Sequence, residues 1–233
     1  MIPAYNEQEG IATYIKEIDY TFHKFEPLYI VVDDASTDQT ILKLENIQEE
    51  VKLLILRNPR NLGHGNALLA GLRLAEKQDS SYVITVDGDG QFDPKDIRKL
   101  FDLRDEADIL IGIRHYVTQK LFYRKVSTMM SRILFFLKYK RFPKDINSPL
   151  RILQKNFLHD FMSIATHEMK IPNILMTAFA LKRSYSIGEV PVEVRRRFGF
   201  NQQGTSWGAK SFPSQTFMRF ALSSTREILN SKF

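Results

Sequence analysis

The segment from Tyr82 to Pro94 constrains the fold most strongly, because a short apolar run ends there in a cluster of acidic residues. Tyr82 to Val86 are β-branched, apolar or aromatic, which predicts a strand buried on both faces of a mostly parallel sheet. Asp87 and Asp89 follow this strand. In a locally extended backbone two residues at this spacing project to one side, and Gly88 between them leaves room for a ligand to approach the main chain.

Two carboxylates held in this way suit Mg²⁺ or Mn²⁺ bound jointly by protein and phosphate. Asp-Gly is also a common turn signal, so an acidic turn without a ligand is the alternative for this segment taken alone. A calcium loop of the helix-loop-helix type is excluded. Phe92 stands where such a loop needs glycine, and Arg98 stands where it needs a bidentate glutamate.

A second apolar run, Leu28 to Val32, also ends in acidic residues, spread over Asp33 to Asp38. Ser36 or Thr37 is expected to cap a helix that begins near Gln39. In an open α/β sheet, ligands bind beyond the carboxyl ends of the strands, so acids from two strand ends converge there. Asp34 and Asp38 could instead be helix-start residues, but two acidic strand ends together favour ligand binding.

Strand and helix patterns alternate along the rest of the chain, which predicts an α/β fold with a mostly parallel sheet flanked by helices. The Gly63-x-Gly65 spacing is not a dinucleotide-binding fingerprint, because Leu68 stands at the third glycine position. A glycine loop that packs the helix start against the sheet is expected there, with His64 at the surface or capping the helix and contact with substrate as the lesser alternative. The other expected strands are 51–57, 108–113 and 185–194; the expected helices are 8–25, a helix ending near 77, 94–103, 118–138, 154–165 and 173–183; and 145–151 is expected to be a polar loop.

Charge is distributed unevenly within the net +6. Residues 1–108 carry 12 Lys and Arg against 21 Asp and Glu, whereas residues 109–233 carry 21 against 6. An acidic half that could hold a cation therefore precedes a basic half that could meet an anionic surface or substrate. No nucleic-acid-binding motif accompanies the basic residues. The chain has no cysteine, which excludes disulfides and zinc-thiolate sites.

The predicted helix 118–138 is amphipathic and basic. No acidic residue occurs between Ile109 and Lys144. Such a helix can lie on an anionic membrane surface, and packing on the sheet or on a partner subunit is the alternative. Its apolar face is predicted to contain Phe122, Val126, Met129, Met130, Ile133, Phe136 and Leu137. Its longest apolar run, Ile133 to Leu137, is too short to span a bilayer.

Six motifs in order resemble glycosyltransferase family 2, and within it the dolichol-phosphate mannosyltransferase and polyprenol-phosphate glycosyltransferase group. They are P-A-Y-N-E at 3–7, V-V-D-D-A-S-T-D at 31–38, R-N-x-x-N-x-G-x-G-x-A at 57–67, D-G-D-G-Q at 87–91, G-I-R at 112–114 and E-V-P-V at 189–192. The resemblance covers nearly the whole chain. It implies a GT-A type, Rossmann-like fold with a mixed, mostly parallel sheet and a helical, basic C-terminal half. It also implies a GDP- or UDP-linked sugar donor and an inverting transfer.

The resemblance also implies roles for individual residues. Asp87 and Asp89 are the expected catalytic residues and metal ligands, with Gln91 as a further metal neighbour. The metal is expected to be Mg²⁺ or Mn²⁺. The residues expected to bind substrate are Pro3, Tyr5, Glu7, Val32, Asp34, Gly88, Gln91, Arg114, Arg124 and one of Arg195 to Arg197, for which we take Arg197.

The acceptor determines whether the reaction needs a base. A lipid phosphate is already anionic, whereas a sugar hydroxyl requires a carboxylate within hydrogen-bond reach. The family's late acidic pair is not evident, and Glu168 and His167 are the nearest candidates. A metal-dependent hexosyltransferase acting on polyprenyl phosphate in cell-envelope biogenesis is therefore favoured. A transferase acting on a glycan hydroxyl and a silent nucleotide-sugar-binding module are the alternatives.

The sequence is expected to form a single domain over 1–233. Residues 1–115 would bind the nucleotide sugar, and residues 116–233 would face the acceptor and the membrane. The expected location is peripheral, on the cytoplasmic face of a membrane with an anionic surface. Nucleic acid is not an expected partner, and a homo-oligomer is left open.

Overall fold

Three parallel strands form the first sheet of the computed structural model, which describes residues 1–115, 133, 135–141, 144–166, 169–198 and 225–229. They are β1 (Ile2–Ala4), β2 (Tyr29–Asp33) and β3 (Leu53–Arg57), in the order β1-β2-β3. β1 and β2 are buried along their whole length, as their apolar composition predicts, and β3 is an edge strand with exposed residues.

A second sheet continues the first. It contains β4 (Tyr82–Thr85), β5 (Ile109–His115), β6 (Arg151–Gln154) and β7 (Ile187–Glu193), in the order β4-β6-β5-β7. β6 is antiparallel to β4 and β5, whereas β5 and β7 are parallel. The nitrogen of Met1 donates to the Ile84 carbonyl over 2.7 Å, and Val86 N donates to the Met1 carbonyl over 3.2 Å. These bonds join β4 to the start of β1 and confirm the expected mixed, mostly parallel arrangement.

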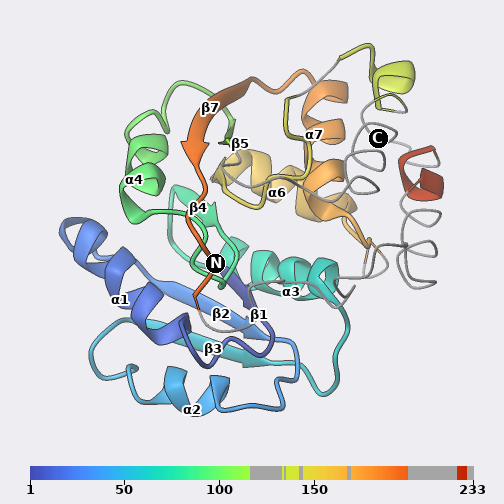
Figure 1. The fold of residues 1–233 in the computed structure, drawn as a ribbon. Helices are drawn as coiled ribbons and strands as arrows, with labels where there is room; N and C mark the ends of the chain where they lie inside the picture. The colour runs from blue at the N-terminus through green and yellow to red at the C-terminus, as the bar shows by residue number, and fades with distance from the viewer. Residues whose placement is uncertain (116–132, 134, 142–143, 167–168, 199–224, 230–233) are drawn as a thin grey trace.

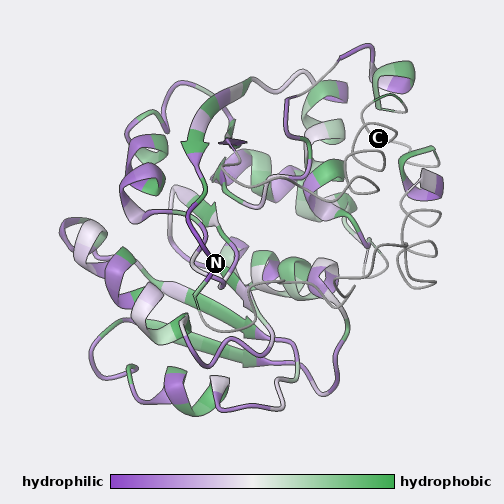
Figure 2. Ribbon diagram, viewed as in Figure 1, coloured by the Kyte–Doolittle hydropathy of each residue, from purple (hydrophilic) through white to green (hydrophobic). Residues whose placement is uncertain are grey.

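Helices flank the sheets and enclose two apolar clusters (Figure 1; Figure 2). α3 (His64–Glu76), α6 (Lys155–Ile164) and α7 (Pro172–Lys182) form one cluster, which contains Leu72, Phe157 and Phe179. α1 (Ile11–Phe22), α2 (Thr40–Glu45) and α4 (Pro94–Asp102) contribute to the other, which contains Tyr14 and Leu100. A 3-10 turn, η1 (His23–Phe25), follows α1 directly.

Two local predictions were wrong. The polar loop expected over 145–151 ends earlier, because Arg151 begins β6. Its guanidinium is fully buried and donates to the carbonyls of Ser148 and Ile146 and to the hydroxyl of Thr177. The second error concerns α2, which has Gln39 at its N-cap position and no side-chain cap. Ser36 instead accepts a hydrogen bond from the main chain of residue 6.

The end of the predicted amphipathic helix is helical at 133 and 135–139. Phe135 is fully buried there, whereas Ile133, Phe136 and Leu137 are 46%, 44% and 59% exposed. The remainder of that predicted helix, including Arg124, lies outside the described residues. Within the parts of the chain that the structure describes, no helix has both the length and the apolar character needed to cross a bilayer.

A candidate donor-binding cleft at the carboxyl ends of the strands

A cleft of about 320 Å³ lies beyond the carboxyl ends of β1, β2 and β4. This is where ligands bind in open α/β sheets. Its walls come from the β1–α1 loop, the end of β2, the loop before α3, the acidic turn after β4 and the segment after β7. The lining residues are Pro3, Ala4, Tyr5, Asn6, Glu7, Asp34, Asn61, Gly63, His64, Ala67, Asp87, Gly88, Asp89 and Arg197.

Asp87 and Asp89, the two carboxylates of the acidic turn that follows β4, both line this cleft. Asp89 is 7% exposed, and its Oδ1 accepts a hydrogen bond of 3.1 Å from Gln91 N. Gly90 permits the turn because its φ is +73°, a conformation that other residues adopt at a cost. Gly88 also packs closely against the core. A Cβ there would lie 2.8 Å from Ile11 Cδ1, so the missing side chain also makes room for the core, while Gly88 itself lines the cleft.

The donor atoms around Asp87 fit a divalent cation. Oδ1 of Asp87 is a buried oxygen with no hydrogen-bond partner in the part of the chain that the structure describes, and His64 Nε2 lies 3.8 Å from it. An unsatisfied carboxylate oxygen is costly unless a ligand meets it. The described residues contain no group of three or more His, Asp or Glu arranged around one metal position. Two protein carboxylates suffice only for a metal shared with phosphate oxygens.

Glu7 and Asp89 share one arginine. Arg197 forms an ion pair with Glu7, and its Nη1 lies 3.9 Å from Asp89 Oδ2. Burial raises the pKa of Glu7 to about 7, while Arg197 opposes this rise and the charges of Asp89 and Asp87 add to it. Burial and the charge of Asp87 raise the pKa of Asp89 to about 6, against the lowering effects of Arg197 and Arg114. The cleft therefore holds more negative charge than its protein groups balance, which favours a cation.

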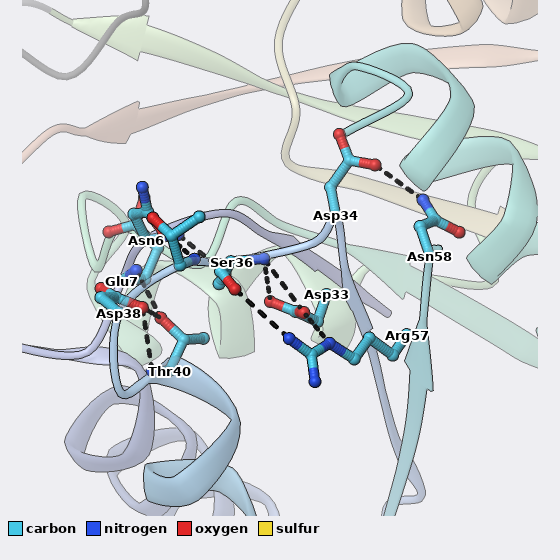
Figure 3. A network of polar contacts seen from close by, with 10 residues as sticks. Asn6, Glu7, Asp33, Asp34, Ser36, Asp38, Thr40, Arg57 and Asn58 are labelled. Carbon is cyan, nitrogen blue, oxygen red and sulfur yellow. Dashed lines mark hydrogen bonds and ion pairs between the residues drawn. The ribbon is translucent and has the colours of Figure 1, made fainter. Parts of the chain in front are cut away.

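Asp34 organises the loop that precedes α3. Its Oδ1 accepts hydrogen bonds from Asn58 Nδ2 (2.7 Å) and Leu62 N (2.9 Å), and its Oδ2 accepts one from Gly63 N (2.8 Å). Figure 3 shows the Asp34 side chain directed toward Asn58. Asp34 is therefore not a helix-start residue. It ties the glycine loop to the end of β2 and lines the cleft.

A second network fixes the β1–α1 loop against the β2–α2 loop (Figure 3). Asn6 N donates to Ser36 Oγ, Glu7 N donates to Thr40 Oγ1, and Gln8 N donates to Asp38 Oδ2. Asp38 also accepts from Thr40 N over 2.9 Å, so the structural alternative considered for Asp38 is confirmed. These bonds hold Tyr5 and Glu7 in place at the rim of the cleft.

Three of the described residues expected to bind substrate do not line the cleft, and a fourth lies outside the described residues. The Val32 side chain is fully buried in β2. Gln91 contributes its main-chain N–H to Asp89. Arg114, near the end of β5, forms a two-pronged ion pair with Asp145 through bonds of 2.7 and 2.9 Å, and its charge reaches Asp89. The fourth, Arg124, falls among the residues left undescribed. Glu168 and His167, which were considered as bases, also lie outside the described residues.

Asn61 and His64 line the cleft although neither was among the expected site residues. His64 was expected mainly as a surface or capping residue. The sequence feature that could have indicated both residues is the Gly63-x-Gly65 loop to which they belong. Gly63 has φ +88° and precedes the first residue of α3, and Gly65 lies so close to the Lys170 carbonyl that a Cβ would be 2.5 Å from the oxygen. The loop therefore turns sharply beside the acidic turn and carries its polar residues with it.

The model of the family described as glycosyl transferase family 2 matches residues 1–165. This range includes every cleft-lining residue except Arg197.

Two relatives of known activity are similar over most of this chain. An undecaprenyl-phosphate 4-deoxy-4-formamido-L-arabinose transferase of Proteus mirabilis is 29% identical, over 77% of this chain and 55% of the relative. A UDP-N-acetylglucosamine–dolichyl-phosphate N-acetylglucosaminyltransferase of Methanococcus voltae is 26% identical, over 83% of each chain. The chain thus spans about half the length of the first relative and most of the second.

Among solved structures, glucosyl-3-phosphoglycerate synthase from Mycobacterium tuberculosis resembles this fold with a TM-score of 0.71. The match covers 100% of this chain and 78% of the other, at 15% sequence identity. That crystal contains Mn²⁺, UDP and phosphoglyceric acid. At this identity the likeness establishes the shared fold.

Proposed function

Because the chain belongs to glycosyltransferase family 2, we propose that it transfers a sugar from a nucleoside-diphosphate sugar to a polyprenyl phosphate. The relatives whose names specify dolichyl phosphate and undecaprenyl phosphate as acceptors support the lipid acceptor.

The observation that carries the proposal is the convergence of the strand ends on one cleft. Glu7, Asp34, Asp87, Asp89 and Arg197 come from segments that are far apart in sequence, and all five line the same cavity. Acidic residues that can hold a cation thus lie beside a guanidinium that can contact phosphate. This combination suits a diphosphate bound together with its metal.

In the proposed mechanism the residues of the cleft bind and orient the donor. The loops containing Tyr5 and Asp34 are fixed by hydrogen bonds before any ligand arrives, so they can hold the nucleoside without rearrangement. Arg197, which lies beside Asp89, would neutralise diphosphate oxygens. Asp87 and Asp89 would hold Mg²⁺ or Mn²⁺, which when bound supplies a Lewis acid for the departing diphosphate. An anionic acceptor phosphate then needs no base.

The exposed end of the basic helix supports a location on a membrane surface. Ile133 and Leu137 present apolar side chains to solvent, and the neighbouring sequence from 109 to 144 contains no acidic residue. An apolar face with basic neighbours suits the boundary of an anionic bilayer. We propose a peripheral location for this reason.

Incubation of the full chain with radiolabelled nucleotide sugars, Mn²⁺ and undecaprenyl or dolichyl phosphate tests the proposal. Label should enter the organic-solvent extract, and omission of the lipid phosphate should abolish this transfer. Label found only in water-soluble or polymeric glycan would instead identify a hydroxyl acceptor. Absence of transfer with every UDP- and GDP-sugar, accompanied by nucleotide binding, would identify a silent binding module and overturn the proposed activity.

A further inference from the structure

A short segment after β7 lies across the acidic turn. This segment, Val194 to Phe198, is called the strap below. Val194 forms an isolated antiparallel bridge with Phe92. Arg195 N donates to the Gln91 carbonyl over 2.9 Å, and Phe198 N donates to the Asp89 carbonyl over 3.1 Å. The side chain of Arg195 adds a bond of 2.6 Å to the Gly90 carbonyl. The strap is therefore bonded to the acidic turn along its whole length.

The side chain of Phe198 occupies a niche that two glycines leave open. A Cβ on Gly10, just before α1, would lie 2.8 Å from Phe198 Cγ, and a Cβ on Gly90 would lie 2.5 Å from Phe198 Cε2. Both distances are too short for real contacts, so any side chain at either glycine would displace the ring. The Phe198 ring also meets Tyr14 edge-on at 6.2 Å, and the Arg195 guanidinium lies over it at 4.8 Å.

The anchored ring lies next to the arginine of the donor cleft. Arg197 precedes Phe198 and contacts both Glu7 and Asp89. Asp89 is linked to the strap a second time through its main-chain carbonyl. A displacement of Phe198 would therefore move Arg197 and Asp89 together. Arg197 is joined to Phe198 by the chain, and Asp89 is joined to it by the main-chain hydrogen bond.

We propose that Phe198 is a positioning residue that seats the strap on the acidic turn and so holds Arg197 and Asp89 ready for the donor diphosphate. This inference rests on the proposed function and adds a residue to it. Holding a flexible arginine in place before binding reduces the entropy lost on association. Phe198 acts through Arg197 and Asp89 and does not itself contact the donor.

Isothermal titration of the full chain with UDP and with GDP, each with Mn²⁺, tests this role. Phe198→Ala should weaken binding of the nucleotide that the wild type binds by about tenfold, the range found for residues that support metal ligands. Phe198→Leu should recover part of the affinity, because leucine fills part of the niche. Phe101→Ala is the matched control. Its ring belongs to a cluster with Phe22 and Phe25 outside the cleft, so its loss should lower stability and leave nucleotide affinity unchanged.

A second pair of variants tests the niche from its other wall. Gly10→Ala should weaken nucleotide binding, since the added methyl group displaces the ring while the Gly10 backbone, at φ −138°, accepts alanine. The double variant Gly10→Ala with Phe198→Ala should bind no worse than the weaker single variant, because both changes break the same contact. Additive losses would contradict a shared niche.

The outcomes separate this inference from the function on which it rests. A wild-type chain that binds neither nucleotide with any divalent metal argues against the proposed function. A wild-type chain that binds one of them, together with Phe198→Ala of equal affinity, overturns the positioning role and leaves the proposed function intact. A loss of affinity in Phe101→Ala as large as that in Phe198→Ala would reduce the role of Phe198 to general stability.

Discussion

Asp89 combines burial, a raised pKa and a place beside a second carboxylate, so its charge is costly in the free protein. Asp89→Asn should reduce transfer by about 10²- to 10³-fold, the cost of losing one preorganised electrostatic contact to a transition state. The melting temperature should not fall, because the change removes a charge that burial disfavours. Transfer assays and thermal unfolding of the same preparation check both expectations.

Asp93→Asn is the control for that variant. Asp93 caps α4 by accepting a hydrogen bond of 2.9 Å from Lys95 N, and asparagine can replace it in this role. It does not line the cleft. Full activity in Asp93→Asn and in Asp89→Asn alike would remove Asp89 from the mechanism.

Glu7 should make the metal-free protein less stable as the pH rises. Its pKa is about 7 in the folded state, against the usual value of 4.5 for a glutamate. Between these two values the folded state holds a proton that the unfolded state has released, so stability is greatest near the lower value and decreases as the pH approaches 7. Melting temperatures in EDTA at pH 5.5, 6.5 and 7.5 should therefore decrease in that order. Glu7→Gln should flatten part of this dependence, and an unchanged slope in the variant would contradict the raised pKa.

At the scale of single elements, the two glycines on the buried side of α3 make different contacts. A Cβ at Gly65 would lie 2.5 Å from the main-chain oxygen of Lys170, whereas a Cβ at Gly71 would meet only the flexible side chain of Met1. Alanine improves helix propensity by about 1 kcal/mol at either position. Gly65→Ala should nevertheless destabilise the protein by about 1 to 3 kcal/mol through overpacking. Gly71→Ala should be neutral or stabilising.

Urea unfolding of the two alanine variants provides the comparison. Equal stabilities would mean that α3 can shift away from the segment before α7. A destabilised Gly65→Ala alone would confirm that the glycine is needed for close approach of backbone to backbone.

β6 depends on a fully buried guanidinium. Arg151 donates to two loop carbonyls and one hydroxyl, and burial lowers its pKa to about 9. Arg151→Met should cost about 3 kcal/mol in the free energy of unfolding, because the carbonyls of Ser148 and Ile146 lose their donors. Arg151→Lys should not restore this loss, since an ammonium group cannot reproduce the planar fork. Denaturant midpoints of the three proteins measure the effect, and a stable Arg151→Met would argue against it.

At the scale of the whole molecule, the exposed apolar side chains at 133–137 should determine membrane attachment. The full chain should float with vesicles of phosphatidylcholine and phosphatidylglycerol, and high salt should weaken this binding. Exchanging Ile133 and Leu137 for glutamate should abolish flotation. Leu54→Glu, at an exposed apolar residue of β3, is the control and should float as the wild type does. Failure of the wild type to float at any salt concentration would remove the membrane proposal.

The division of the chain at residue 115 stays a prediction at this scale. The two sheets adjoin through Met1, and the cleft takes residues from both sides of the division because Arg197 follows β7. The nucleotide-binding role expected for residues 1–115 therefore needs at least one residue from the other half in the proposed mechanism.

The sequence by itself determined the strand ends. Apolar β-branched runs followed by acidic residues predicted β2, β4 and the edge of the sheet at which Asp34, Asp87 and Asp89 lie, because the carboxyl ends of parallel strands share one edge. The sequence did not predict β6, since its four residues are too few to show a strand pattern and the first of them is an arginine, whose charge only the surrounding structure buries.

Tertiary structure alone decided which polar side chains reach the cleft. Val32 and Gln91 belong to motifs that resemble those of the family. The pleat of β2 nevertheless directs Val32 into the core, and the turn leaves only the main chain of Gln91 beside Asp89. His64 and Phe198 acquire their surroundings from segments far away in sequence. The physical reason is that local pattern fixes which face of an element is apolar, whereas the positions of loops depend on long-range packing and hydrogen bonds.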